Sequence, residues 1–346
     1  TVNWKTGVTG TYMVQNAALT PVRVVSDIAI TTGTATASSA GTPFTSADVG
    51  RTISIDGASA TSDGTFTANI LSVASGVATL SANAKRTVTA AKGRVYNRDK
   101  DITVKGGTWN RAATVAAIDT TLGNGGLLSA MTTAFLHVDN LTVDIEKITS
   151  PAGSAKYAVY VADCNGFTVN VHDMDVVSDG VHITGPASRG HIGYLAGKTG
   201  DDFLALTTAD YPNYAATAGD ITDVTWGTLL PRAASSGIAL VPGAGHRIDG
   251  IKGNFLGGTA NANTARIIYD FLYASLVGGT IGDVDLGTLA GDAGGNCLYI
   301  ADVNADRLTA KVIGTSTAGQ KVKIAKSTGA TDPNTIKSLV LNDSSA

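Results

Sequence analysis

Val-Ser-Asp-Gly-Val-His-Ile-Thr-Gly-Pro, at residues 177–186, is followed by Gly-Lys-Thr-Gly-Asp-Asp-Phe-Leu-Ala-Leu at residues 197–206. In each stretch an apolar residue, Val181 or Leu204, comes two positions after an aspartate, Asp179 or Asp202. The two apolar residues are 204 − 181 = 23 positions apart. A repeat period in the twenties is typical of solenoids, in which each unit buries its apolar face only by stacking on the next. The two stretches therefore predict successive coils of a solenoid built from parallel strands.

The same stacking predicts a cluster of carboxylates. Parallel strands in neighbouring coils lie about 5 Å apart, so Asp179 and Asp202 should be adjacent, with Asp201 beside them. Three carboxylates at this spacing repel one another, and the pKa of at least one should rise. A raised pKa is what a general acid needs near neutral pH. The alternative is that these aspartates only cap turns, because Asp before Gly is a common turn element.

The composition favours strands and excludes several classes of function. Only 15% of the residues are charged while 43% are hydrophobic, and 41 glycines accompany 8 prolines, which suits short strands joined by tight turns rather than amphipathic helices. A net charge of −3 gives no basic surface for nucleic acid. No apolar run approaches the roughly 20 residues that span a bilayer, so we expect no membrane insertion. Cys164 and Cys297 lack metal-site spacing and are expected to be free buried thiols, and no metal or cofactor is predicted.

Four segments can be distinguished. Residues 1–27 are expected to form N-terminal strands, or a first coil. Residues 28–95 are rich in Thr, Ser and Ala with strand-like alternation, which predicts a small inserted all-β domain, the alternative being a decorated loop without a core. Residues 96–320 are predicted to be the solenoid, and residues 321–346 a C-terminal cap or a segment that contacts other subunits.

Apolar residues define the inward side of one strand column, and their neighbours define its outward side. The predicted inward column is Val159, Val181, Leu204, Ile238, Ile267 and Leu298. Alternation then places a second set outward: Tyr160, His182, Ala205, Ala239, Ile268 and Tyr299. Small residues in the middle and tyrosines at the ends suggest a shallow groove able to hold a sugar chain. An ordinary exposed sheet face is the alternative.

The two aspartate stretches resemble a known family. Ser178–Val181 and Gly200–Leu206 are similar to the Asn-Thr-Asp-Gly and Gly-Asp-Asp motifs of polygalacturonase-like glycoside hydrolases, which are right-handed parallel β-helices. The stretch Ile102–Trp109 and the inserted segment resemble the β-helical tailspike and tail-fibre proteins of bacteriophages. The resemblance implies an all-β fold, a right-handed parallel β-helix with a small inserted domain. It also implies a homotrimer in a virion tail whose partners are host surface polysaccharide and other tail proteins.

The resemblance also assigns roles to residues. It implies that Asp201 is the general acid and that Asp179 and Asp202 activate water in an inverting mechanism. The family's next histidine is replaced here by Ser236. Its Arg-Ile-Lys motif is matched by Arg266-Ile267, with Ile268 in place of the lysine that grips an acidic sugar. Galacturonate specificity is therefore not expected.

The predicted substrate-binding residues are His182, Arg266, Tyr160 and Tyr299, with Arg266 as a clamp for a substrate anion or else a solvated arginine. The resemblance, taken with these residues, implies three alternative functions. The first is a phage tail protein that binds and hydrolyses a host surface polysaccharide. The second is a virion adhesin of the same fold that binds glycan without cleaving it. The third is a secreted microbial glycoside hydrolase.

Overall fold

The structure is a computed structural model dominated by β-strands. It describes residues 2–3, 14–16, 18, 20–60, 64–111, 131–150, 156–209, 217–243, 245–268, 278–317, 320–326 and 335–342. The described residues contain no α-helix. A short 3₁₀ helix, η2, is formed by Ser46–Asp48. No helix in the described ranges is long and apolar enough to cross a membrane.

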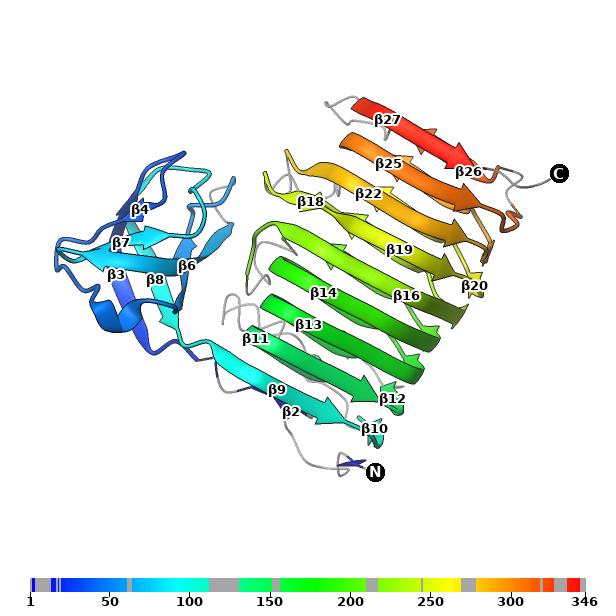
Figure 1. Ribbon diagram of the computed structural model, residues 1–346, viewed down its shortest axis with the longest axis horizontal. Coiled ribbons are helices and arrows are strands. Elements are labelled where there is room, and N and C mark those ends of the chain that lie inside the picture. The colour runs from blue at the N-terminus through cyan, green and yellow to red at the C-terminus, as the bar shows by residue number, and fades with distance from the viewer. Residues whose placement is uncertain are drawn as a thin grey trace.

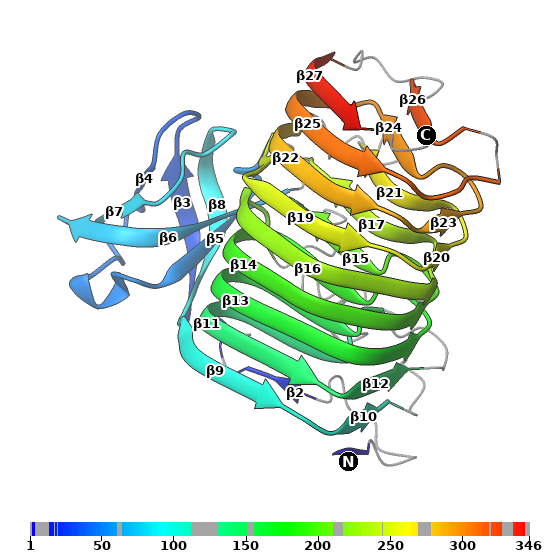
Figure 2. The same ribbon diagram turned by 45° about the vertical axis from the view of Figure 1, so that its right-hand side comes forward.

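Most strands stack in parallel register into a right-handed parallel β-helix with three faces, which confirms the predicted fold (Figures 1 and 2). Four long strands bend around corners and contribute to more than one face: β11 (Thr133–Ile145), β13 (Val159–Val176), β14 (Val181–Thr199) and β16 (Ile221–Ala233). The face that begins at Val159 and Val181 is called here the site face. It continues through β15 (Leu204–Thr207), β17 (Ser236–Val241), β21 (Asn263–Ile268), β24 (Leu298–Ala301) and β26 (Val322–Ala325).

The other two faces complete each coil. The long face contains the middle parts of the four long strands together with β9 (Asp99–Lys105), β18 (Arg247–Asp249), β19 (Ile251–Leu256), β22 (Thr280–Leu289), β25 (Asn304–Val312) and β27 (Thr335–Asn342). The narrow face contains β10 (Thr108–Asn110), β12 (Lys147–Ser150), β20 (Thr259–Ala260) and β23 (Asp292–Ala293). The described ends of the chain extend this stack at both ends. The strands β1 (Val2–Asn3) and β2 (Val14–Gln15) pair with β10 and β11. The strands β26 and β27 pair with β24 and β25 and add a further coil to the stack.

The register of the site face matches the prediction for the first four coils and departs from it at the fifth. Val159, Val181, Leu204 and Ile238 are consecutive register partners, and all are fully buried. The partner of Ile238 is then Ala265, not Ile267. The predicted columns are therefore displaced by two residues at this coil, because an alanine fills the inward position. Arg266, not Ile268, joins the outward column.

One corner of the β-helix requires a left-handed backbone conformation in successive coils. The residue at this corner has positive φ in each of six successive coils. These residues are Asp101 (56°), Asn140 (64°), Gly166 (74°), Arg189 (54°), Asp223 (54°) and Gly250 (64°). Gly, Asn and Asp tolerate this region better than other residues, so the sequence of the corner follows from its geometry. Arg189 is the exception.

The inserted segment is a small antiparallel β-barrel (Figure 1). Its strands run in the order β3 (Arg23–Ile30), β8 (Val88–Tyr96), β5 (Thr52–Asp56), β6 (Thr65–Ala74), β7 (Val77–Leu80) and β4 (Thr36–Ala37). A bridge between Ala29 and Ser38 closes the ring. The barrel has a core of its own, which includes Ile28, Ile53 and Phe66. It begins at Arg23, five residues before the predicted boundary, because β3 is needed to pair with β8.

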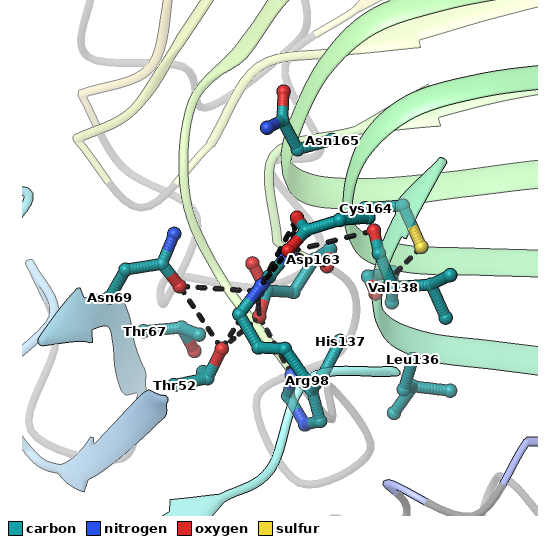
Figure 3. Close-up of polar contacts among 12 residues, drawn as sticks. Thr52, Thr67, Asn69, Arg98, Leu136, His137, Val138, Asp163, Cys164 and Asn165 are labelled. Carbon is teal, nitrogen blue, oxygen red and sulfur yellow. Dashed lines mark hydrogen bonds and ion pairs between the residues drawn. The ribbon is translucent and has the colours of Figure 1, made fainter. Parts of the chain in front are cut away.

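A buried ion pair joins the barrel to the β-helix (Figure 3). Arg98 follows β8 and donates to Asp163 Oδ2 of β13 at 2.6 Å and to Asp139 Oδ1 of β11 at 2.8 Å. Asp163 Oδ2 also accepts from Thr52 Oγ1 of the barrel at 2.6 Å and lies 2.7 Å from His137 Nδ1. Because Arg98, Asp163 and His137 are all buried, this joint fixes the barrel against the coils.

Candidate functional site

The three aspartates meet at the corner where the narrow face turns into the site face. Asp179 precedes β14, and Asp201 and Asp202 precede β15 in the next coil. The amide of Gly180 donates to the carbonyl of Asp202 at 2.9 Å. A Cβ on Gly180 would lie 2.5 Å from the Phe203 carbonyl oxygen, so glycine is what allows the coils to approach here. One carboxylate oxygen from each aspartate lies within 4.8 Å of the other two.

Burial differs among the three and shifts their titration. Asp179 and Asp202 are buried, whereas Asp201 is exposed. Burial raises the pKa of Asp202 to about 7. The positive charge of Arg266 lowers this pKa, and the negative charges of Asp179 and Asp201 raise it further. Incomplete hydration raises the pKa of Asp201 as well, and the negative charge of Asp179 adds to this rise. The cluster therefore holds a proton in the range where a general acid must be protonated.

A histidine holds Asp179 in place. His182 Nδ1 lies 2.7 Å from Asp179 Oδ2, and His182 Nε2 lies 3.0 Å from Thr207 Oγ1. The imidazole stacks on the ring of Tyr157, with centroids 3.9 Å apart and planes 16° apart. His182 is 3% exposed, so it orients Asp179 from within the protein.

Arg266 makes the corresponding contact with Asp202. Its guanidinium donates to Asp202 Oδ2 at 2.6 Å from two coils away. The register neighbours that stand between, Ala205 and Ala239, are small, and the Arg266 side chain remains 26% exposed. Arg266 is thus engaged by the cluster itself, although its partial exposure still lets a ligand contact it.

Three polar atoms near this corner have no hydrogen-bond partner in the described structure. Asp202 Oδ1, Arg266 Nε and Ser236 Oγ are all buried and unpaired. The Phe203 amide donates to the Ser236 carbonyl at 2.8 Å, so Ser236 lies in the coil next to Asp202, at the position that the resemblance assigns to a histidine. Buried polar groups are normally satisfied by protein or water, so unpaired atoms grouped here indicate space for a water molecule or a ligand group.

The outward column is more covered than an open groove requires. Tyr160, Ala205 and Ala239 are fully buried, with 0%, 1% and 0% exposure. Tyr299 is partly exposed, is in register with Arg266, and has Lys323 Nζ 5.8 Å from its ring centroid. Four strand spacings, roughly 19 Å, separate Tyr299 from His182. The structure therefore brings His182 and Arg266 to the aspartates, buries Tyr160, and places Tyr299 outside the cluster.

The carboxylate spacing differs from the one expected for inversion. An inverting pair usually has its carboxyl groups roughly 6.5–9.5 Å apart, leaving room for water between them. The nearest oxygens here lie within 4.8 Å because neighbouring coils fix the distance and the side chains do not diverge. Three oxygens at this spacing can also ligate a cation, but the Arg266 guanidinium already occupies one side of Asp202.

Two site residues were missed by reasoning from the sequence. Tyr157, which stacks on His182, occupies the position two residues before Val159, equivalent to Asp179 and Asp202 in the following coils. The repeat alone is enough to identify it. Thr207 closes the hydrogen-bond chain from Asp179 through His182 and has no motif of its own. Both cysteines are free and buried, as expected, and burial raises the pKa of Cys164 to about 12.

Comparisons with known proteins give a likeness of fold only. No protein-family model matches the chain, and no curated protein matches it. Among solved structures, it is similar to the tailspike protein gp49 of Pseudomonas phage LKA1. The identity is 11% and the TM-score 0.35, over 99% of this chain and 68% of that one. It is also similar to the tailspike gp61 of Pseudomonas phage phi297, at 10% identity and a TM-score of 0.29, over 87% of this chain and 63% of that one. The assignment of a site therefore rests on the geometry of this chain.

Proposed function

We propose that this protein hydrolyses glycosidic bonds in a polysaccharide. The observation that carries the proposal is the group of three carboxylates within 4.8 Å of one another, two of which have raised pKa values. Glycoside hydrolysis needs one carboxyl group that is protonated and another that is ionised at the same bond. A role in capping a turn would need only one aspartate. The electrostatic repulsion among three adjacent carboxylates is therefore not explained by such a structural role.

The burial of each aspartate determines the catalytic role that we assign to it. Asp201 is exposed and is the general acid that protonates the leaving oxygen. Asp179, oriented by His182, is the ionised carboxylate that acts on the water or the anomeric carbon. Asp202, oriented by Arg266, assists it once ionised, that is, as the pH approaches 7. The short spacing favours a retaining outcome over the inverting one that the resemblance implies. Proton NMR of the first-formed anomer distinguishes the two.

The substrate is a neutral or weakly charged surface polysaccharide. Three aspartates outnumber the single arginine in contact with them, so the cluster repels an acidic sugar. Ser236 and Ile268 stand where a polygalacturonase-like enzyme has a histidine and a lysine. The setting proposed from the sequence resemblance is a bacteriophage tail, with a host surface polysaccharide and other tail proteins as partners and a homotrimer as the assembly. Detection of the chain in purified virions separates this setting from that of a secreted microbial hydrolase.

Release of reducing ends tests the activity. Wild-type protein incubated with host cells or purified surface glycan should release new reducing ends, in the presence of EDTA as well. Asp201→Asn should lower the rate by at least about a hundredfold, the usual contribution of a general acid, while glycan binding survives. Asp283→Asn is the matched control, because Asp283 is exposed on β22 and pairs with Arg307. Its rate should equal that of the wild type.

A non-catalytic adhesin is the second candidate, and the burial of Asp179 and Asp202 favours it. Both carboxylates already have a partner in the protein, His182 and Arg266 respectively. If wild-type protein adsorbs to host glycan and yields no reducing ends under any condition tested, the adhesin replaces the hydrolase.

A further inference from the structure

A cavity of about 510 Å³ lies between the barrel and the β-helix, away from the aspartate cluster. One wall is formed by β6 and residues 81–85 of the barrel, and the other by β13, β14, the start of β16 and His246. Asp163 and Asn165 line it where β13 leaves the site face, whereas the catalytic aspartates lie where the chain enters that face. The cavity is therefore a separate feature of the molecule.

The two walls are held in a fixed relation. The Arg98–Asp163 ion pair, whose two residues line the cavity, and the bond from Thr52 to Asp163 join the two walls (Figure 3). On the β-helix side the amide of Ala218 donates to Thr67 Oγ1 of the barrel at 3.3 Å. Because both parts are tied together at buried points, the cavity exists before any ligand arrives and costs little to organise.

Amide and hydroxyl groups line the cavity alongside the charged residues: Asn69, Ser81, Asn83, Asn165, Ser188 and Thr222. Figure 3 shows Asn69 on the barrel and Asn165 on the β-helix, on opposite sides of the joint. Asn165 Oδ1 accepts from Ser188 Oγ at 2.8 Å, which fixes the orientation of the amide in the cavity wall. Groups that both donate and accept are suited to the hydroxyls of a sugar.

The charges around the cavity cancel. Arg98 is neutralised by Asp163 and Asp139, and Lys85 faces Asp220, which His246 also contacts at 3.1 Å. Without an excess of either sign, the cavity offers no strong site for a phosphate or a divalent cation. Ala82 and Pro186 add apolar surface against which the C–H groups of a pyranose ring can pack.

We propose that this cavity binds a neutral sugar residue. Its volume falls in the range of small-ligand sites, roughly 300–1,000 Å³, and its position between two domains is a common one for such sites. The site is independent of the aspartates, so a sugar bound here is held without being cleaved. A glycan chain that carries the same sugar is thereby anchored beside the barrel.

Saturation-transfer NMR with free monosaccharides tests this site. The probes are glucose, galactose, mannose, rhamnose and N-acetylglucosamine, each titrated against the full chain. At least one should bind the wild type, and Asn83→Ala combined with Asn165→Ala should weaken that binding by about tenfold, the effect of two lost hydrogen bonds. Asn304→Ala on β25, outside the cavity, is the matched control and should bind like the wild type.

A second variant guards against a folding artefact. Thr222→Trp fills the cavity from the β-helix wall and should abolish binding, while Asp201→Asn should leave it unchanged. The proposal is overturned if no probe binds the wild type, or if binding persists in both cavity variants. Loss of reducing-end release in the Asp201 variant concerns only the proposed hydrolysis, so the two proposals fail separately.

Discussion

At the scale of single residues, the aspartate corner is a place where protonation and folding are linked. The folded-state pKa of Asp202 is about 7, well above that of an unfolded aspartate, because burial disfavours its charge. A raised pKa means that the stabilisation is complete below about pH 4 and is lost as the pH rises towards 7. The buried carboxyl thus favours a mildly acidic working range.

This linkage predicts a change of stability with pH. We expect a lower Tm at pH 8 than at pH 5, and a smaller difference in Asp202→Asn, which cannot ionise. Asp283→Asn, at an exposed carboxylate, should retain the wild-type difference. Thermal unfolding followed by circular dichroism measures both. An equal pH dependence in wild type and Asp202→Asn would contradict the raised pKa.

The activity should follow the same titration. If Asp201 is the general acid, kcat/KM for glycan hydrolysis falls as the pH rises through the titration of the cluster. The pKa of Asp201 is raised, so this alkaline limb should lie above pH 4. A pH–rate profile that stays flat from pH 4 to pH 9 would exclude Asp201 from this role.

Among the corner residues with positive φ, Arg189 is the one whose side chain is least suited to that conformation. It has φ of 54° in a corner where the equivalent residues are Gly, Asn and Asp. Arg189→Asn should therefore stabilise the protein by about 1 kcal/mol, because asparagine tolerates the left-handed region. Urea denaturation gives the difference, with Arg86→Asn as a control at a position without positive φ. No gain in Arg189→Asn would show that its side chain compensates for the strain.

The spacing of apolar residues in the sequence predicted the positions of some of these residues in the coils and not of others. The 23-residue step from Val181 to Leu204 identified true register partners, because no loop intervenes between their coils. The same reasoning chose Ile267 where Ala265 is the inward residue, since an apolar pattern ranks a large side chain above a small one. The pairing of Arg266 with Asp202 crosses two coils, and no local pattern encodes a contact of that kind.

At the scale of elements, the joint between barrel and β-helix depends on a few buried charged residues. Their pairing could not be predicted from the sequence. Asp163 is a single acidic residue in the otherwise apolar or aromatic run Val159–Cys164. This interruption is the one feature of the sequence that points to a buried ion pair there. Its partners Arg98, His137 and Thr52 come from three separate strands or connections. Their meeting is a consequence of the folded coils.

Breaking the joint should be costly. Asp163→Ala leaves Arg98 and His137 buried without their shared carboxylate, and a broken buried pair typically costs about 3–5 kcal/mol. Asp56→Ala removes the partly exposed partner of Arg94 in the same barrel and should cost about 1 kcal/mol or less. Chemical denaturation of the two variants makes the comparison. Equal losses would mean that the joint contributes no more than a surface ion pair.

At the scale of the whole molecule, the last described coil leaves apolar side chains in solvent. Ile324 and Val340, on β26 and β27, are 48% and 45% exposed. Exposed apolar residues on the surface of a coil are suited to contact with another chain. This observation is compatible with the trimer that the sequence resemblance implies.

We therefore predict a homotrimer in solution. Multi-angle light scattering should give three times the mass of one chain. Ile324→Ser combined with Val340→Ser should shift the distribution towards monomer, whereas Val24→Ser, at an exposed position on the barrel, should not. A monomeric wild type at micromolar concentration would contradict the prediction.

The barrel has its first and last strands side by side, with Arg23 in register with Val95. Asn16 Nδ2 also donates to Asp99 Oδ2 at 2.9 Å, which keeps the flanking chain together at the same point. Residues 23–96 therefore form a cassette: the chain leaves and re-enters the coils at one point, so a different compact domain could replace the barrel along the same path, provided that it supplied a new partner for Asp163 in place of Thr52.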